Sequence, residues 1–114
     1  MNITQKEEQY HLTIFSKKSK NVYIFITKSD ILHFLDCIKY ILTTCIKNNE
    51  TIGSIEVRIP NIYKCMWNQY MDYFEEILDM EVDSIKIILE NESIDIEIYK
   101  NLLQQVELCI QEVF

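Results

Sequence analysis

The stretch DILHFLDCIKYILTTCIK, residues 30–47, is the feature that most limits how this chain can fold. Its apolar residues recur at three- and four-residue spacing, which places them on one face of an α-helix. Ser29 is the expected N-cap, and NNETIG, with Gly53 available for a turn, is expected to end the helix. We expect the apolar face to cover a sheet. That face comprises Ile31, Phe34, Leu35, Ile38, Ile41, Leu42 and Cys45.

Four short segments are typical of strands, because they are rich in β-branched and aromatic residues and partly alternate. YHLTIF (10–15) and VYIFIT (22–27) predict a hairpin across the polar turn SKKSKN. SIEVRI (54–59) alternates and is closed by a proline, and DSIKIILE (83–90) is the fourth segment.

The segment YKCMWNQYMDYFEEILDM, residues 63–80, predicts a second helix. On a helical wheel its apolar residues fill one side, about half of the circumference, and its polar residues fill the other. The apolar side comprises Met66, Trp67, Tyr70, Met71, Tyr73, Phe74, Ile77, Leu78 and Met80.

The C-terminal segment allows two interpretations at residues 94–98. IDIEI alternates like a strand and could form a hairpin with 85–89, or Asp95 could cap a helix with Ile94 and Tyr99 as its hydrophobic staple. The helix from about residue 95 is slightly favoured. From Ile98 onward the helical periodicity is clear, and Leu108 points away from the apolar face.

We therefore predict one globular domain, residues 1–114, of α+β or α/β class with the order β-β-α-β-α-β-α. Strand–helix–strand units usually cross over right-handed between parallel strands. The expectation is a small mixed sheet with a parallel core, three helices, and four strands, or five if 94–98 is a strand. This order resembles that of STAS-type regulatory domains, which implies binding to partner proteins. The phosphorylatable serine of those domains has no counterpart, because residues 55–83 contain no Ser or Thr.

Charge is distributed unevenly along the chain. Residues 1–47 carry a net charge of +3, and residues 48–114 carry −10. An acidic domain repels phosphate backbones, so we expect no direct nucleic-acid binding and favour a basic protein partner. The short basic run KKSK (17–20) is typical of a solvated turn.

Composition and the chain start bear on origin and compartment. The chain has no alanine, one glycine and one proline, but many Ile, Lys and Asn, which are the residues of AT-rich codons. This bias indicates a low-GC bacterium or its phage. The start of the chain is polar, and no apolar run reaches roughly 18 residues. The four cysteines form no CxxC motif. Together these features predict a cytoplasmic protein without membrane association.

Residue patterns for catalysis, cofactors and metals are sparse. His33 and Cys37 share a helix face at i, i+4 spacing, which supplies two metal ligands or a Cys–His pair but not a complete site. A single glycine leaves no backbone cradle for phosphate. We therefore expect no enzyme activity, no cofactor and no metal.

The acidic end of segment 63–80 is the strongest candidate for a site. In a helix, Glu75, Glu76 and Asp79 would lie in the last turns and face the negative end of the helix dipole, at a cost of roughly 0.3–1 kcal/mol each. Aromatic and methionine side chains beside charged groups are typical of protein interfaces. The predicted partner-binding residues are Trp67, Met71, Asp72, Glu75, Glu76 and Asp79.

These patterns favour a non-enzymatic protein-binding domain. The expected role is a small acidic inhibitor, either an immunity protein against a basic or nuclease toxin or a phage-encoded inhibitor of a host enzyme. The alternatives are a STAS-like regulatory module, and a homodimeric structural or adaptor protein associating through the wide apolar face of segment 63–80.

Overall fold

The computed structural model describes residues 1–15, 20–68, 73–77, 84–89 and 96–114, with the backbone alone for 65–68 and 73–77. The elements follow the order β1 (Asn2–Lys6), β2 (Gln9–Phe15), β3 (Lys20–Phe25), α1 (Lys28–Asn48), β4 (Ser54–Arg58), β5 (Ile62–Asn68), β6 (Tyr73–Ile77), β7 (Ser84–Ile88) and α2 (Ile96–Val113). The coarse prediction of an α+β protein is confirmed. Within the described ranges there are two helices rather than the three expected.

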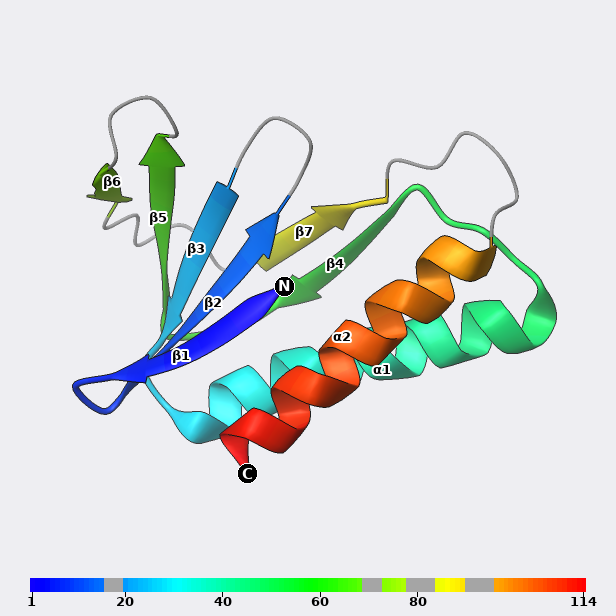
Figure 1. Cartoon of the computed structure of the whole chain (residues 1–114), viewed down its shortest axis with the longest axis horizontal. Helices are drawn as coiled ribbons and strands as arrows, with labels where there is room; N and C mark the ends of the chain where they lie inside the picture. The colour runs from blue at the N-terminus through cyan, green and yellow to red at the C-terminus, as the bar shows by residue number, and fades with distance from the viewer. Residues whose placement is uncertain (16–19, 69–72, 78–83, 90–95) are drawn as a thin grey trace.

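The strands form two sheets rather than one. The larger sheet has the order β1-β2-β3-β5-β6, and β4 pairs with β7 in a second, two-stranded sheet. Both helices lie side by side beneath the sheets, running in opposite directions (Figure 1). The core between these layers draws on both sheets and both helices, with Leu12, Phe25, Phe34, Ile85 and Tyr99 among its buried members.

The expected parallel core is wrong, because every described strand pair is antiparallel. The reason lies in the path between β3 and β5. Helix α1 carries the chain away from the end of β3, and β4 brings it back (Figure 1). Strand β5 therefore starts where β3 ends, with Phe25 opposite Ile62 and the Ile26 N–H donating to the Asn61 carbonyl. A single crossover would have left β3 and β5 parallel.

The helix predicted over residues 63–80 is also wrong wherever the structure describes this segment. Residues 62–68 form β5 and residues 73–77 form β6, and the two pair antiparallel with Trp67 opposite Phe74. Residues 69–72 and 78–80 lie outside the described residues. Strand β5 has hydrogen-bonded neighbours on both sides, β3 and β6, and so lies within the sheet.

The helix ends agree with the expected ones except at the start of α1. Thr27, not Ser29, caps α1, because its hydroxyl oxygen accepts a hydrogen bond from the Asp30 N–H at 3.1 Å. At the other end the helix stops within NNETIG, as expected: Asn49 takes the left-handed conformation, and its N–H donates to the carbonyls of Cys45 and Ile46. Residues 96–98 belong to α2, which confirms the helical interpretation there; residues 94 and 95 lie outside the described ranges.

Strand β1 was not expected from the polar start of the chain. It pairs with β2 through a two-residue turn at Glu7 and Glu8, both with positive φ. Ile3 is the residue of β1 that packs against the core, which is why the strand lacks a clear apolar alternation. The expected hairpin of β2 and β3 is confirmed.

Candidate functional site

The predicted docking residues fall on a strand hairpin instead of a helix. Trp67 lies in β5, and Glu75 and Glu76 lie in β6, opposite Met66 and Cys65. Because successive positions of a strand alternate between the faces of a sheet, positions 75 and 76 belong to opposite faces. The unfavourable helix-dipole placement that first singled out these acids therefore does not exist. Met71, Asp72 and Asp79 lie outside the described residues.

Strand β6 is an edge of the larger sheet. Among the described elements it pairs with β5 alone, so one row of its backbone N–H and C=O groups has no described strand beside it. Such an edge is a template on which a strand of another chain can add. The acids at positions 75 and 76 thus lie on a backbone edge that is suited to pairing.

The His33–Cys37 pair is present on α1 but incomplete as a reactive site. Its thiol sulfur lies 3.7 Å from His33 Nε2, as the i, i+4 spacing predicted. Within the described ranges no group of three or more potential metal ligands occurs, so no third ligand joins this pair there.

Two further cysteines are core residues. Burial raises the pKa of the Cys45 thiol, and the nearby carboxylate of Glu50 raises it further. Burial likewise raises the pKa of Cys109, with the carboxylate of Glu112 adding to the effect. Both thiols therefore favour the neutral form, which is neither the nucleophilic nor the metal-binding state.

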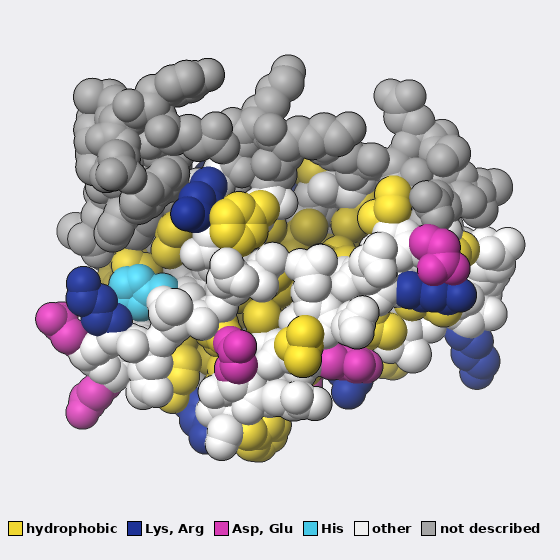
Figure 2. Space-filling view, viewed as in Figure 1, with side chains coloured by type: hydrophobic (Ala, Val, Ile, Leu, Met, Phe, Trp, Pro, Cys, Tyr) yellow, Lys and Arg dark blue, Asp and Glu magenta, His cyan; other side chains and the backbone are white. Residues whose placement is uncertain are grey.

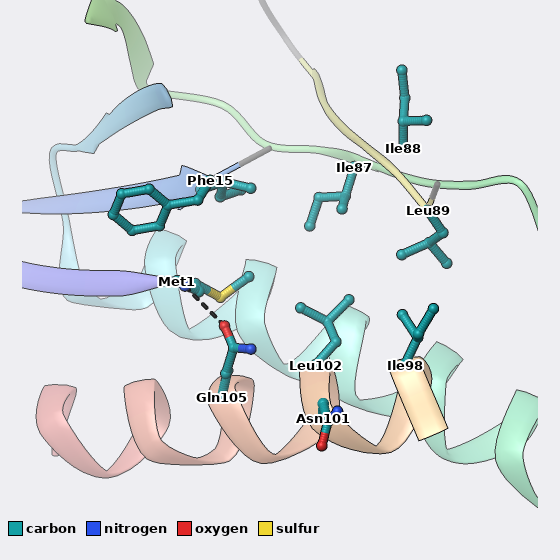
Figure 3. A pocket seen from close by; sticks show the side chains of 10 residues that line it. Met1, Phe15, Ile87, Ile88, Leu89, Ile98, Asn101, Leu102 and Gln105 are labelled. Atoms are coloured by element: carbon teal, nitrogen blue, oxygen red, sulfur yellow. Dashed lines mark hydrogen bonds between the residues drawn. The ribbon is translucent and has the colours of Figure 1, made fainter. Parts of the chain in front are cut away.

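A second candidate site, absent from the sequence expectations, is an apolar hollow of about 520 Å³ between β2, β7 and α2. Figure 2 shows hydrophobic side chains gathered in the middle of this face of the molecule. In Figure 3, Ile87 of β7 and Leu89, which follows the end of β7, point toward Leu102 and Ile98 on α2. The lining residues are Met1, Ile14, Phe15, Ile87, Ile88, Leu89, Ile98, Asn101, Leu102 and Gln105.

Three large apolar side chains of this lining are exposed to solvent. Ile88 is 67% exposed, Phe15 51% and Ile98 40%. A sequence signal for the hollow was present in the run Ile87–Ile88–Leu89, because three consecutive apolar residues break the alternation of a strand with one solvated face. Clustered exposed apolar residues of this kind mark binding surfaces more often than scattered ones do.

No helix in the described part of the chain is long and apolar enough to cross a membrane. Comparisons with protein-family models, with curated proteins and with solved structures find no match for this chain.

Proposed function

We propose that this chain is a non-enzymatic protein-binding domain that acts in the cytoplasm as a small acidic inhibitor of a basic protein. The target would be a basic or nuclease toxin, with the chain as its immunity protein, or a host enzyme inhibited on behalf of a phage. The observation that carries the proposal is the acidic edge strand β6, with Glu75 and Glu76 on a backbone edge that no described strand pairs.

Charge supports a basic partner over a second copy of the chain at this edge. Residues 48–114 carry a net charge of −10, which would steer a cationic surface toward them and make association sensitive to salt. Antiparallel self-pairing of β6 centred on Glu75 would place two glutamates directly opposite each other, which destabilises a strand pair. A basic strand of a partner removes that repulsion.

The other two roles have lost the features that suggested them. The resemblance to STAS-type domains rested on the element order β-β-α-β-α-β-α, and the described elements follow another order. The homodimer was expected to form through a helix at 63–80, which the described residues do not contain. Capture of a kinase, phosphatase or sensor would still support the STAS-like module. Self-association would still support the homodimer.

The test is partner capture from the native host, followed by binding measurements across a salt series. Trp67 is the single tryptophan and lies on β5 beside the edge, so its fluorescence reports binding there. The combined substitutions Glu75→Lys, Glu76→Lys and Asp79→Lys should weaken binding at least tenfold and flatten its salt dependence.

A matched control carries Asp36→Lys, Glu107→Lys and Glu112→Lys, three exposed acids on α1 and α2. It makes the same change in net charge away from β6. Equal weakening by both triple variants would show a general charge effect, and unchanged binding by the β6 variant would exclude this edge as the docking site.

A further inference from the structure

The hollow runs along the edge of β7 that faces away from β4. Ile87 and Ile88 belong to opposite faces of the strand, yet both line the hollow, as does Leu89. Consecutive residues can line one space only where that space wraps the edge of the strand. Among the described elements β7 pairs with β4 alone, so this edge has no described strand beside it.

The hydrogen-bond pattern shows which backbone groups face that edge. The Leu89 N–H donates to the Gly53 carbonyl at 2.9 Å, continuing the ladder in which Ile88 lies opposite Ser54. In an antiparallel pair, hydrogen-bonded and non-hydrogen-bonded positions alternate. Lys86 and Ile88 are therefore the positions whose N–H and C=O groups point away from β4 and toward the edge.

Across the hollow, the end of β2 also has no described strand beside it on the β1 side. The ladder between β1 and β2 stops where Asn2 lies opposite Thr13, so Ile14 and Phe15 extend beyond it. No Cα atom of β2 lies within 8 Å of one of β7. Paired strands are only about 4.8 Å apart, so β2 and β7 are too far apart to pair and leave room between them. The hollow lies in this space, with Phe15 of β2 on one side and Ile87 and Ile88 of β7 on the other (Figure 3).

The lining suits an uncharged peptide. Among the described residues that line it, none is charged, and the polar side chains are the amides of Asn101 and Gln105. These lie one turn apart on α2 and so share a face. A primary amide both donates and accepts hydrogen bonds, as the peptide backbone does. Gln105 Oε1 already accepts one from the amino group of Met1 at 2.8 Å (Figure 3).

We propose that this hollow receives an extended apolar segment of a partner protein, which adds as a strand to the free edge of β7. Its backbone pairs with Lys86 and Ile88, its alternate side chains enter the hollow against Leu102 and Ile98, and Asn101 contacts its peptide groups. We expect a charged residue at an inward position to bind poorly, because the described lining offers no opposite charge. The inference rests on the proposed protein-binding function but concerns a surface separated from β6 by β3 and β5.

The probe is a heptapeptide of alternating threonine and valine, acetylated and amidated at its ends, followed by amide NMR spectra of the labelled protein. We expect saturable shifts centred on residues 86–89 and on the α2 lining, with a Kd below about 1 mM. A second peptide is N-methylated at the alternate residues whose N–H groups would face β7. It keeps the side chains but cannot donate hydrogen bonds to the strand. It should bind at least about tenfold more weakly.

The test variant is Ile88→Lys, and its control is Leu108→Lys. Both replace an exposed apolar side chain, 67% and 54% exposed, but Leu108 lies outside the hollow. Loss of peptide binding in the first variant and its retention in the second support the proposal. Absence of shifts at about 1 mM peptide, or equal binding of the methylated peptide, overturns it.

Two further outcomes distinguish this proposal from self-association and from the β6 proposal. Concentration-dependent dimerisation that Ile88→Lys abolishes would make a second copy the occupant and overturn the partner segment. The charge-reversed β6 variant should bind the peptide like the wild type, so failure of peptide binding and failure of the β6 proposal remain distinguishable.

Discussion

The hydroxyl of Tyr99 lies 2.6 Å from both the backbone nitrogen and the carbonyl oxygen of Ile52. It accepts a hydrogen bond from the N–H and donates one to the carbonyl. Tyr99 is on α2 and fully buried, whereas Ile52 belongs to the segment that connects α1 to β4. One side chain thus fixes the C-terminal helix to the chain that enters the small sheet.

Replacing this hydroxyl should destabilise the fold. Tyr99→Phe keeps the ring but leaves the N–H and the carbonyl of Ile52 without their partner, at an expected cost of about 1–3 kcal/mol in the free energy of unfolding measured with urea. Tyr40→Phe, at a side chain 73% exposed, serves as the control and should change stability by less than about 0.5 kcal/mol. Equal effects of the two substitutions would contradict a structural role for the Tyr99 hydroxyl.

The start of α1 gives a second prediction, because sequence and structure point to different caps. The Thr27 hydroxyl accepts from the Asp30 N–H, whereas Ser29 lies exposed within the first turn. Thr27→Ala should lower the free energy of unfolding by about 0.5–2 kcal/mol, and Ser29→Ala should leave it within about 0.5 kcal/mol. Urea titrations of the two variants check this, and a larger loss from Ser29→Ala would reverse the assignment of the cap.

Segment 63–80 shows why hydrophobic periodicity misled at the sheet centre. The segment is divided between strands β5 and β6, so no single strand alternation runs through its apolar residues. The apolar residues of β5 and β6 together then fill a wide arc when they are projected on a helical wheel. The density of Tyr, Phe and Trp in the segment was the signal that favoured strands. By contrast, α1 and the second half of α2 have one solvated face, and there periodicity succeeded.

The hollow could not be derived from sequence for a different reason. It depends on which strand edges remain unpaired, and that follows from β4 pairing with β7 and from β1 ending before Ile14. Local patterns fix which residues of a strand are apolar but not which strand lies beside it. The excess apolar residue Ile88 was visible, whereas the gap beside it was not.

The buried thiols predict a loss of stability at high pH. Burial raises the pKa of Cys45 and Cys109 above the ordinary thiol value of 9.0. Between that value and the raised one, the unfolded chain releases thiol protons that the folded chain retains, so ΔG of unfolding falls as pH rises. The contribution is complete below about pH 9 and is lost through the folded-state pKa values.

Urea unfolding at pH 8 and pH 10 under reducing conditions checks this. The double variant Cys45→Ala, Cys109→Ala is less stable overall, because it leaves small cavities, but should lose less stability between the two pH values than the wild type. An equal or steeper loss in the variant would mean that these thiols do not contribute to the pH dependence.

The turn between β1 and β2 predicts a gain in stability. Glu7 and Glu8 hold φ values of 52° and 65°, a left-handed conformation that costs a non-glycine residue roughly 1–2 kcal/mol. A two-residue hairpin with both residues at positive φ favours Asn-Gly, so Glu7→Asn with Glu8→Gly should raise the free energy of unfolding by about 1 kcal/mol. Glu7→Gln with Glu8→Gln removes the same two charges but keeps the backbone strain. Its effect on the free energy of unfolding therefore measures the charge repulsion alone, in a chain of net charge −7. If both pairs stabilise equally in urea titrations, charge rather than backbone strain explains the gain.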